Sequence, residues 1–184
     1  MVKIEKNIIL GVTASIAIYK SCDLIRKLRI CGFAVHVVMT KEAEALIKPI
    51  VFQSLSGNRV FFGGMFDTLG SSDTWDIEHI SLATKADLIL IAPATANIIA
   101  KLSAGICDDL LSCIVCASKA KILIAPAMNE NMYKHKITQS NIEKLKSCNY
   151  KFILPRKGVL VCGAVGVGCL AETDQIVKEV KKLL

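Results

Sequence analysis

Aromatic residues are scarce in this chain of 184 residues, in which Phe, Trp and Tyr together make up 5%. Acidic residues are also in the minority, with 16 Asp and Glu against 23 Lys and Arg, but the basic residues are scattered along the chain. Nucleic-acid-binding surfaces combine clustered basic residues with aromatic side chains that stack on bases. We therefore expect no nucleic-acid partner, and the net charge of +7 favours an anionic small ligand instead.

The chain also lacks an apolar run of the ~20 residues that a membrane-spanning helix needs. The longest candidate, residues 88–100, is interrupted by Pro93 and Asn97. Residues 8–18 follow two lysines and resemble the apolar part of a signal peptide, but they also form the first strand, turn and helix of a pattern that recurs along the chain. We favour this second interpretation and expect no membrane partner.

A disulfide scaffold or a zinc site is not indicated either. Eight Cys residues are present, but the length of the chain and its apolar content of 53% suit a core-stabilised domain with reduced thiols in the cytoplasm. Cys113 and Cys116 form one C-x-x-C pair inside a helical pattern, without a second pair of ligands nearby. We interpret them as one face of a helix and expect no bound metal.

No repeat or linker divides the sequence, which is predicted to form one domain over residues 1–184. Short apolar runs alternate with helical patterns, which predicts an α/β fold: a doubly wound (Rossmann-like, flavodoxin-like) parallel sheet with helices on both faces. The predicted strands are 7–12, 33–39, 87–91, 121–125 and 150–154. The predicted helices are 13–29, one from about 40, 49–56, 80–85, 97–103, 108–119, 131–148 and one from Thr173, with Thr173 or Asp174 as its N-cap.

Two segments fall outside this alternation. Residues 58–78 carry several aromatic side chains among Gly, Ser, Thr and Asp, and we expect this long irregular segment to pack against a neighbouring subunit. Residues 158–170 contain four Gly and no long apolar period, which predicts a flexible flap.

Two of the predicted strands are followed by small residues and then an asparagine. The segment 92–97 ends in Asn97, and the segment 125–129 ends in Asn129. Ligands of open parallel sheets bind at the carboxyl ends of the strands, where an amide can hold a carboxylate or a carbonyl. We expect both amides to face one pocket, the alternative for each being a helix cap.

Thr13 and Ser15 begin the first predicted helix, where N–H groups and the helix dipole favour a phosphate, although an ordinary N-cap is equally compatible. Thr40, at the end of the second predicted strand, adds a hydroxyl group nearby. His79 and Cys162 are candidates for proton transfer. Their structural alternatives are a histidine without a catalytic role and a small apolar filler.

Several segments are distinctive in combination: residues 11–17, 79–80, 92–97, 103–111, 126–133 and 161–163. With these segments the sequence, from about residue 6 to 182, resembles the flavin-dependent cysteine decarboxylases, and among them those that act on phosphopantothenoylcysteine in coenzyme A biosynthesis. The Pro-Ala-Met-Asn block that ends at Asn129, combined with Cys162, is the most specific part. The sequence departs from the usual family pattern at Ala14, Thr95, Tyr133 and Ala164, where Gly, Ser, Trp and Asp are common.

This resemblance implies flavin mononucleotide (FMN) as cofactor and a homo-oligomer, a trimer or a dodecamer, with the flavin at a subunit boundary. It implies catalytic roles for His79, Asn129 and Cys162. The FMN phosphate is expected at Thr13, Ser15, Ile16 and Thr40, and the flavin ring at Leu46, Pro93, Ala94, Thr95 and Ala96. The substrate is expected at Asn97, Ala127, Met128 and Asn129, with its carboxylate on Asn129.

The implied reaction converts 4′-phosphopantothenoylcysteine to 4′-phosphopantetheine. Oxidised flavin accepts a hydride from the carbon that bears sulfur, and the resulting thioaldehyde stabilises the charge left by CO2. His79 assists the proton and thiolate side of this oxidation, and Cys162 protonates the enethiolate while the hydride returns.

Three alternatives share the fold. Peptidyl-cysteine decarboxylases stop at the enethiol and have no need of Cys162. Flavin prenyltransferases lack the Pro-Ala-Met-Asn block, and regulatory relatives that inhibit phosphatases carry long acidic extensions, which this sequence lacks. The chain ends at Leu184, so we expect the synthetase that is fused to many bacterial relatives to be a separate protein.

Overall fold

The computed structural model describes residues 6–63, 78–159, 163 and 165–184. Cys162 and most of the predicted interfacial segment, residues 64–77, lie outside these residues. Within the described ranges, no helix is both long and apolar enough to cross a bilayer.

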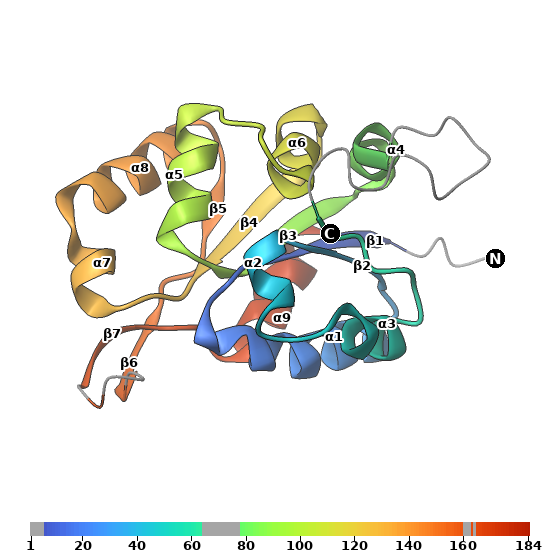
Figure 1. Ribbon diagram of the computed structural model, residues 1–184, viewed down its shortest axis with the longest axis horizontal. Helices are drawn as coiled ribbons and strands as arrows, with labels where there is room; N and C mark the ends of the chain where they lie inside the picture. The colour runs from blue at the N-terminus through green and yellow to red at the C-terminus, as the bar shows by residue number, and fades with distance from the viewer. Residues whose placement is uncertain (1–5, 64–77, 160–162, 164) are drawn as a thin grey trace.

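Five parallel strands form the central sheet in the order β2-β1-β3-β4-β5 (Figure 1). The strands are β1 (Asn7–Val12), β2 (Ala34–Met39), β3 (Leu88–Ala94), β4 (Lys121–Pro126) and β5 (Lys151–Phe152). This is the flavodoxin-like order, in which the direction of winding reverses between β1 and β3. The predicted doubly wound α/β fold is therefore confirmed.

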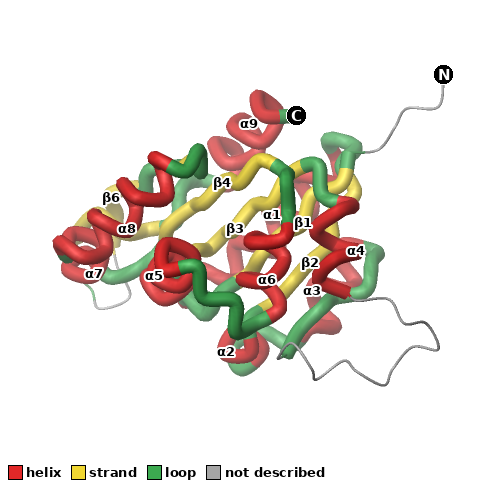
Figure 2. Tube along the Cα trace, turned by 90° about the horizontal axis from the view of Figure 1, so that it is seen from above, coloured by secondary structure: helices red, strands yellow, loops and turns green. Residues whose placement is uncertain are grey.

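Helices cover both faces of the sheet, as Figures 1 and 2 show. One face carries the 3-10 turn η1 (Ile16–Tyr19), α1 (Lys20–Ile30), α3 (Pro49–Ser56) and α9 (Thr173–Leu183). The other carries α4 (Glu78–Lys85), α5 (Ala96–Ala104), α6 (Leu110–Ala117) and α8 (Lys136–Ser147). The short helices α2 (Lys41–Glu44) and α7 (Glu130–Lys134) follow the carboxyl ends of β2 and β4.

Strand β3 is buried along its whole length because helices lie on both of its faces. Leu88 and Leu90 pack into the core on the α1 and α9 side, whereas Ile89 and Ile91 pack into the core on the α5 and α6 side. Period-two alternation between two apolar cores explains why this strand is a continuous apolar run in the sequence.

Some predicted boundaries were wrong. The helix expected over residues 131–148 is interrupted at His135, whose ψ of 133° is extended and whose ring accepts a hydrogen bond from the Ile137 N–H, so α7 and α8 are separate. Strand β3 continues through Pro93 to Ala94 rather than ending at Ile91. Helix α9 begins at Thr173 as expected, but Glu172 occupies the N-cap position.

Residues 158–170 were predicted to form a flexible flap without a strand, and the described part contains regular structure that was not predicted. Strand β6 (Arg156–Val159) pairs in antiparallel register with β7 (Val165–Cys169). We call these two strands the ribbon. The ribbon lies beyond the end of the central sheet (Figure 1), so its sequence lacks the apolar alternation of a core strand. Its glycines are also unusual in strands, which made the ribbon harder to predict.

The end of β1 is joined to the end of β3 by one buried hydroxyl group. Thr13 is 2% exposed, and its Oγ1 donates a hydrogen bond to the Pro93 carbonyl (2.8 Å) and accepts one from the Thr95 N–H (3.1 Å). The hydroxyl therefore holds together the two loops that leave the sheet at its carboxyl edge.

Replacing Thr13 with Val keeps the shape of the side chain but deprives the Pro93 carbonyl of its donor and the Thr95 N–H of its acceptor. We expect Thr13→Val to lower the free energy of unfolding by about 1–3 kcal/mol, because buried polar groups are costly to leave unpaired. Urea denaturation measures this difference. Thr13→Ser retains the hydroxyl and should lose less, and a Val variant as stable as the wild type would contradict the bridging role.

Asp109 fastens the connection between α5 and α6. Its Oδ1 accepts from the Ser112 N–H (2.8 Å) in a capping box, and its Oδ2 lies 2.9 Å from Lys101 Nζ. Burial by itself raises the pKa of Asp109, but the Lys101 ammonium and the Ser112 N–H bind the charged form, so the pKa lies below its usual value.

A carboxyl group with a lowered pKa in the folded state stabilises the fold above its unfolded pKa, and that stabilisation is lost as the pH falls. We expect Asp109→Asn to be less stable than the wild type at pH 7, with the difference shrinking below about pH 4. Denaturation at a series of pH values tests this. Asp108→Asn is the matched control, because Asp108 also contacts Lys101 but its side chain is 56% exposed. Equal pH profiles for the two variants would refute the role of Asp109.

Candidate functional site

A cavity of about 550 Å³ opens at the carboxyl edge of the sheet, where ligands of this fold class bind. Three groups of residues form its wall: the start of the first helix, the loops after β3 and β4, and the ribbon with the residue after it. The lining residues are Ala14, Ser15, Ile16, Ala17, Tyr19, Lys20, Thr95, Ala127, Met128, Asn129, Met132, Arg156, Val159, Gly168, Cys169 and Leu170.

The first wall is the N-terminal turn of η1, which continues directly into α1. Ser15 has extended backbone angles, and its Oγ accepts a hydrogen bond from the Ala17 N–H (3.3 Å), so it is an N-cap as one of the two alternatives proposed. Its hydroxyl proton is still available to a ligand. N–H groups at a helix start lack partners within the helix, so this turn is also suited to an anion.

The second wall is the loop after β4. Ala127 is buried and donates its N–H to the Ala94 carbonyl (2.9 Å), which fixes this loop to the end of β3. Asn129 is exposed and caps α7, with its Oδ1 accepting from the Asn131 N–H (2.8 Å). The amide NH2 group of Asn129 donates to no acceptor among the described residues, so it can bind a carboxylate oxygen.

The third wall is the ribbon, which is docked on the Asn129 loop through its backbone. The Met128 N–H donates to the Gly168 carbonyl (3.0 Å), and the Val167 N–H donates to Glu130 Oε1 (3.2 Å). A Cβ atom on Gly168 would overlap the Met128 carbonyl, so only Gly allows this approach. The Lys134 ammonium and the Val167 N–H stabilise the Glu130 carboxylate and hold its pKa below the usual value.

The predicted site residues other than Cys162, which lies outside the described residues, divide into two groups. The structure brings six of them together in the cavity wall: Ser15, Ile16, Thr95, Ala127, Met128 and Asn129. The others lie outside that wall: Thr13, Thr40, Leu46, His79, Pro93, Ala94, Ala96 and Asn97. The expectation that two amides face one pocket therefore holds in this cavity for Asn129 alone, since Asn97 is exposed in the first turn of α5.

His79 is far from the cavity within one chain. It lies in α4, whereas the ribbon stands at the opposite end of the molecule (Figures 1 and 2). A catalytic contact between His79 and a ligand in this cavity is thus not formed by one chain alone.

Sequence reasoning missed the cavity residues Lys20, Arg156 and Gly168. Gly166 and Gly168, two apart, were the available signal, because that spacing places both on one face of a strand. Arg156 and Lys20 carried no signal, since isolated basic residues are common on any surface.

The C-x-x-C pair lies on a helix, as predicted, within α6. Burial raises the pKa of the Cys113 thiol, and burial together with the neighbouring Cys107 raises that of Cys116 to about 11. Both thiols are therefore protonated and weakly nucleophilic at neutral pH. The described residues hold no group of three metal-ligating side chains, and a metal-free site stays a prediction.

Comparison with known proteins gives consistent matches. A family model described as Flavoprotein matches residues 2–184. A probable phosphopantothenoylcysteine decarboxylase of Streptococcus mutans is 42% identical over 181 residues, which cover 97% of this chain and 99% of that protein. The coenzyme A biosynthesis bifunctional protein CoaBC of Bacillus subtilis is 44% identical over 178 residues, and the chain spans 43% of its length.

Solved structures agree. A PPC decarboxylase mutant complexed with pantothenoylaminoethenethiol superposes with a TM-score of 0.86 at 27% identity, over 97% of both chains. The FMN-dependent cysteine decarboxylase SpaF superposes with a TM-score of 0.82 at 26% identity, over 97% of each. Because the family model matches nearly every residue and a curated relative is matched along its whole length, this chain belongs to the Flavoprotein family.

Proposed function

We propose that the protein catalyses the FMN-dependent decarboxylation of 4′-phosphopantothenoylcysteine to 4′-phosphopantetheine in coenzyme A biosynthesis. One observation carries this proposal: the anion-binding start of the first helix and the Asn129 loop line the same cavity. The similarity to the S. mutans decarboxylase along its whole length supports the choice of substrate.

The residues of the cavity fit FMN. Ser15 and the N–H groups that follow it are suited to the phosphate. Ile16 and Tyr19 are 55% and 61% exposed beside them, and Met128 and Met132 add apolar surface to the same cavity, which suits a flat aromatic ring. When bound, FMN supplies reversible hydride acceptance. Thr13 is proposed to hold the loops of the site in place, since its hydroxyl proton is already donated to the Pro93 carbonyl.

The Asn129 loop is proposed to hold the substrate acid. The NH2 group of Asn129 donates to the carboxylate, while Ala127 and Met128 shape the pocket beside it. The loop is held on two sides, by the Ala94 carbonyl and by the ribbon, so the amide is presented in a fixed orientation. Asn97 remains a candidate for the outer part of the substrate.

His79 is proposed to act on a ligand held by a neighbouring subunit. One chain keeps His79 away from its own cavity, and Ile16, Tyr19 and Leu46 are large apolar side chains exposed at or beyond the carboxyl edge of the sheet. A homo-oligomer, a trimer or a dodecamer, would cover this apolar surface and complete the site. We place this assembly in the cytoplasm, where its thiols stay reduced.

Purified protein should be yellow or become yellow with FMN, and should release CO2 from 4′-phosphopantothenoylcysteine. Absorption spectroscopy followed by the mass of the product measures both. Asn129→Asp should abolish turnover, because a carboxylate would face the substrate carboxylate. Asn131→Asp introduces the same charge outside the cavity wall and should stay active. A protein that remains colourless in FMN, or equal loss in both variants, would contradict the proposal.

Cys162 is proposed to donate the proton that the enethiolate takes up. We expect Cys162→Ser to release CO2 but to accumulate the enethiol, with a mass 2 Da below that of phosphopantetheine, because a hydroxyl is a far weaker acid than a thiol. Mass spectrometry of the product measures the ratio. Cys148→Ser removes an exposed thiol that does not line the cavity and is the control for the loss of a thiol. Normal phosphopantetheine production by Cys162→Ser would remove Cys162 from the mechanism.

A further inference from the structure

Two cations, Lys20 and Arg156, line a cavity whose described lining residues include no carboxylate. Lys20 is the first residue of α1, and Arg156 is the first residue of β6. Two elements far apart in the sequence therefore place positive charge on the same cavity. An anionic ligand group gains most from such an arrangement, since the wall itself offers no competing negative charge.

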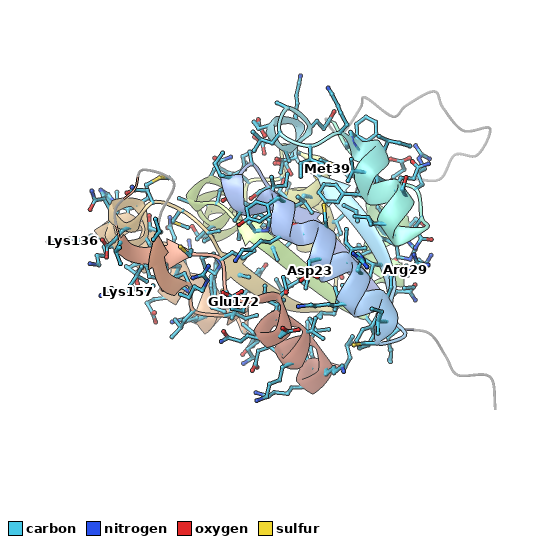
Figure 3. The ribbon with its side chains drawn as sticks, turned by 90° about the horizontal axis from the view of Figure 1, so that it is seen from below. Asp23, Arg29, Met39, Lys136, Lys157 and Glu172 are labelled. Carbon is cyan, nitrogen blue, oxygen red and sulfur yellow. The ribbon has the colours of Figure 1, made fainter. Side chains whose placement is uncertain are left out.

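One exposed acidic residue outside the cavity wall, Glu172, forms ion pairs with both cations. Arg156 Nε lies 2.7 Å from Glu172 Oε1, and Lys20 Nζ lies 3.7 Å from Glu172 Oε2. Glu172 is the N-cap residue of α9, and Figure 3 shows it where the chain leaves the ribbon, next to the strand that carries Lys157. Two positive charges share one negative charge, so the group retains a surplus positive charge.

The ion pair with Glu172 engages only the Nε side of the Arg156 guanidinium. No acceptor among the described residues contacts either Nη group, so both can bind another acceptor. Nη1 lies above Gly158, where an added Cβ would stand 2.7 Å away, so the absence of a side chain at Gly158 makes room for the fork. A planar fork with its Nη groups available matches the oxygens of a phosphate.

We propose that Arg156, supported by Lys20 and oriented by Glu172, binds the phosphate monoester of the substrate and makes the enzyme select phosphorylated substrate. This assignment rests on the proposed function. The substrate carries two anionic ends, and the Asn129 amide is assigned to the carboxylate, so the second anionic end requires a separate cationic site. Arg156 lies in the same cavity but on the ribbon, a different element.

FMN also carries a phosphate monoester, so its phosphate is the competing occupant. We assign that phosphate to the helix start at Ser15 and Ile16, which belongs to a different wall from Arg156. The two sources are separable by experiment, because riboflavin lacks the phosphate of FMN and pantothenoylcysteine lacks the phosphate of the substrate.

The test uses the FMN-loaded enzyme and compares kcat/KM for phosphopantothenoylcysteine with kcat/KM for pantothenoylcysteine. We expect the wild type to favour the phosphorylated substrate. Arg156→Gln should lower kcat/KM for the phosphorylated substrate, so that the preference falls roughly 10- to 100-fold. Arg156→Lys keeps the charge but loses the fork, so its preference should be intermediate. Lys157→Gln removes the same charge from the neighbouring residue, which does not line the cavity, and should retain the preference.

The same variants are titrated with FMN and with riboflavin, with flavin fluorescence as the readout. We expect Arg156→Gln to leave the affinity ratio between FMN and riboflavin within about threefold of the wild type. Losing a charged hydrogen bond to the FMN phosphate would change that ratio by more. A larger fall in that ratio, or an unchanged substrate preference, overturns the assignment while the proposed function stands. A wild type that turns over neither substrate overturns the proposed function itself.

Discussion

Parallel pairing of β1 with β3, from Ile8 beside Leu88 to Gly11 beside Ile91, places the ends of both strands at one edge of the sheet. Every group in the candidate site depends on this register, because the first helix leaves β1 and α5 leaves β3 at the same level. Thr13 then closes the gap between the two exits with a buried hydroxyl group. Since Ala94 in turn accepts a hydrogen bond from Ala127, the chain of contacts extends from β1 through β3 to the Asn129 loop.

The sequence predicted the elements that bury a clear apolar face. Strand β1 and helix α3 have the bounds expected of them, since Pro49 and Gly57 mark the start and end of α3 in the usual way. The break at His135 was not predictable, because a helical pattern continues across it and a local ring–backbone contact stops the helix. The ribbon was missed because it makes no core contact and its strands are rich in glycine.

The same distinction applies to the candidate site. Ser15 and Asn129 were predicted, since a strand end followed by a helix start gives each a defined place in the fold. The charged part of the wall was not predicted, because Arg156 is paired with Glu172, sixteen residues further along the chain, only through the tertiary structure. Tertiary contacts of this kind leave no periodic trace in a sequence.

The docking of the ribbon has a consequence for how such a site can change over evolutionary time. Its attachment to the Asn129 loop uses two main-chain groups, the Gly168 carbonyl and the Val167 N–H, and it requires Gly at position 168. The cavity-facing side chains of Arg156 and Val159 take no part in those hydrogen bonds. Substitutions there alter what the cavity recognises while the ribbon keeps its place, so substrate preference can diverge among relatives without rebuilding the fold.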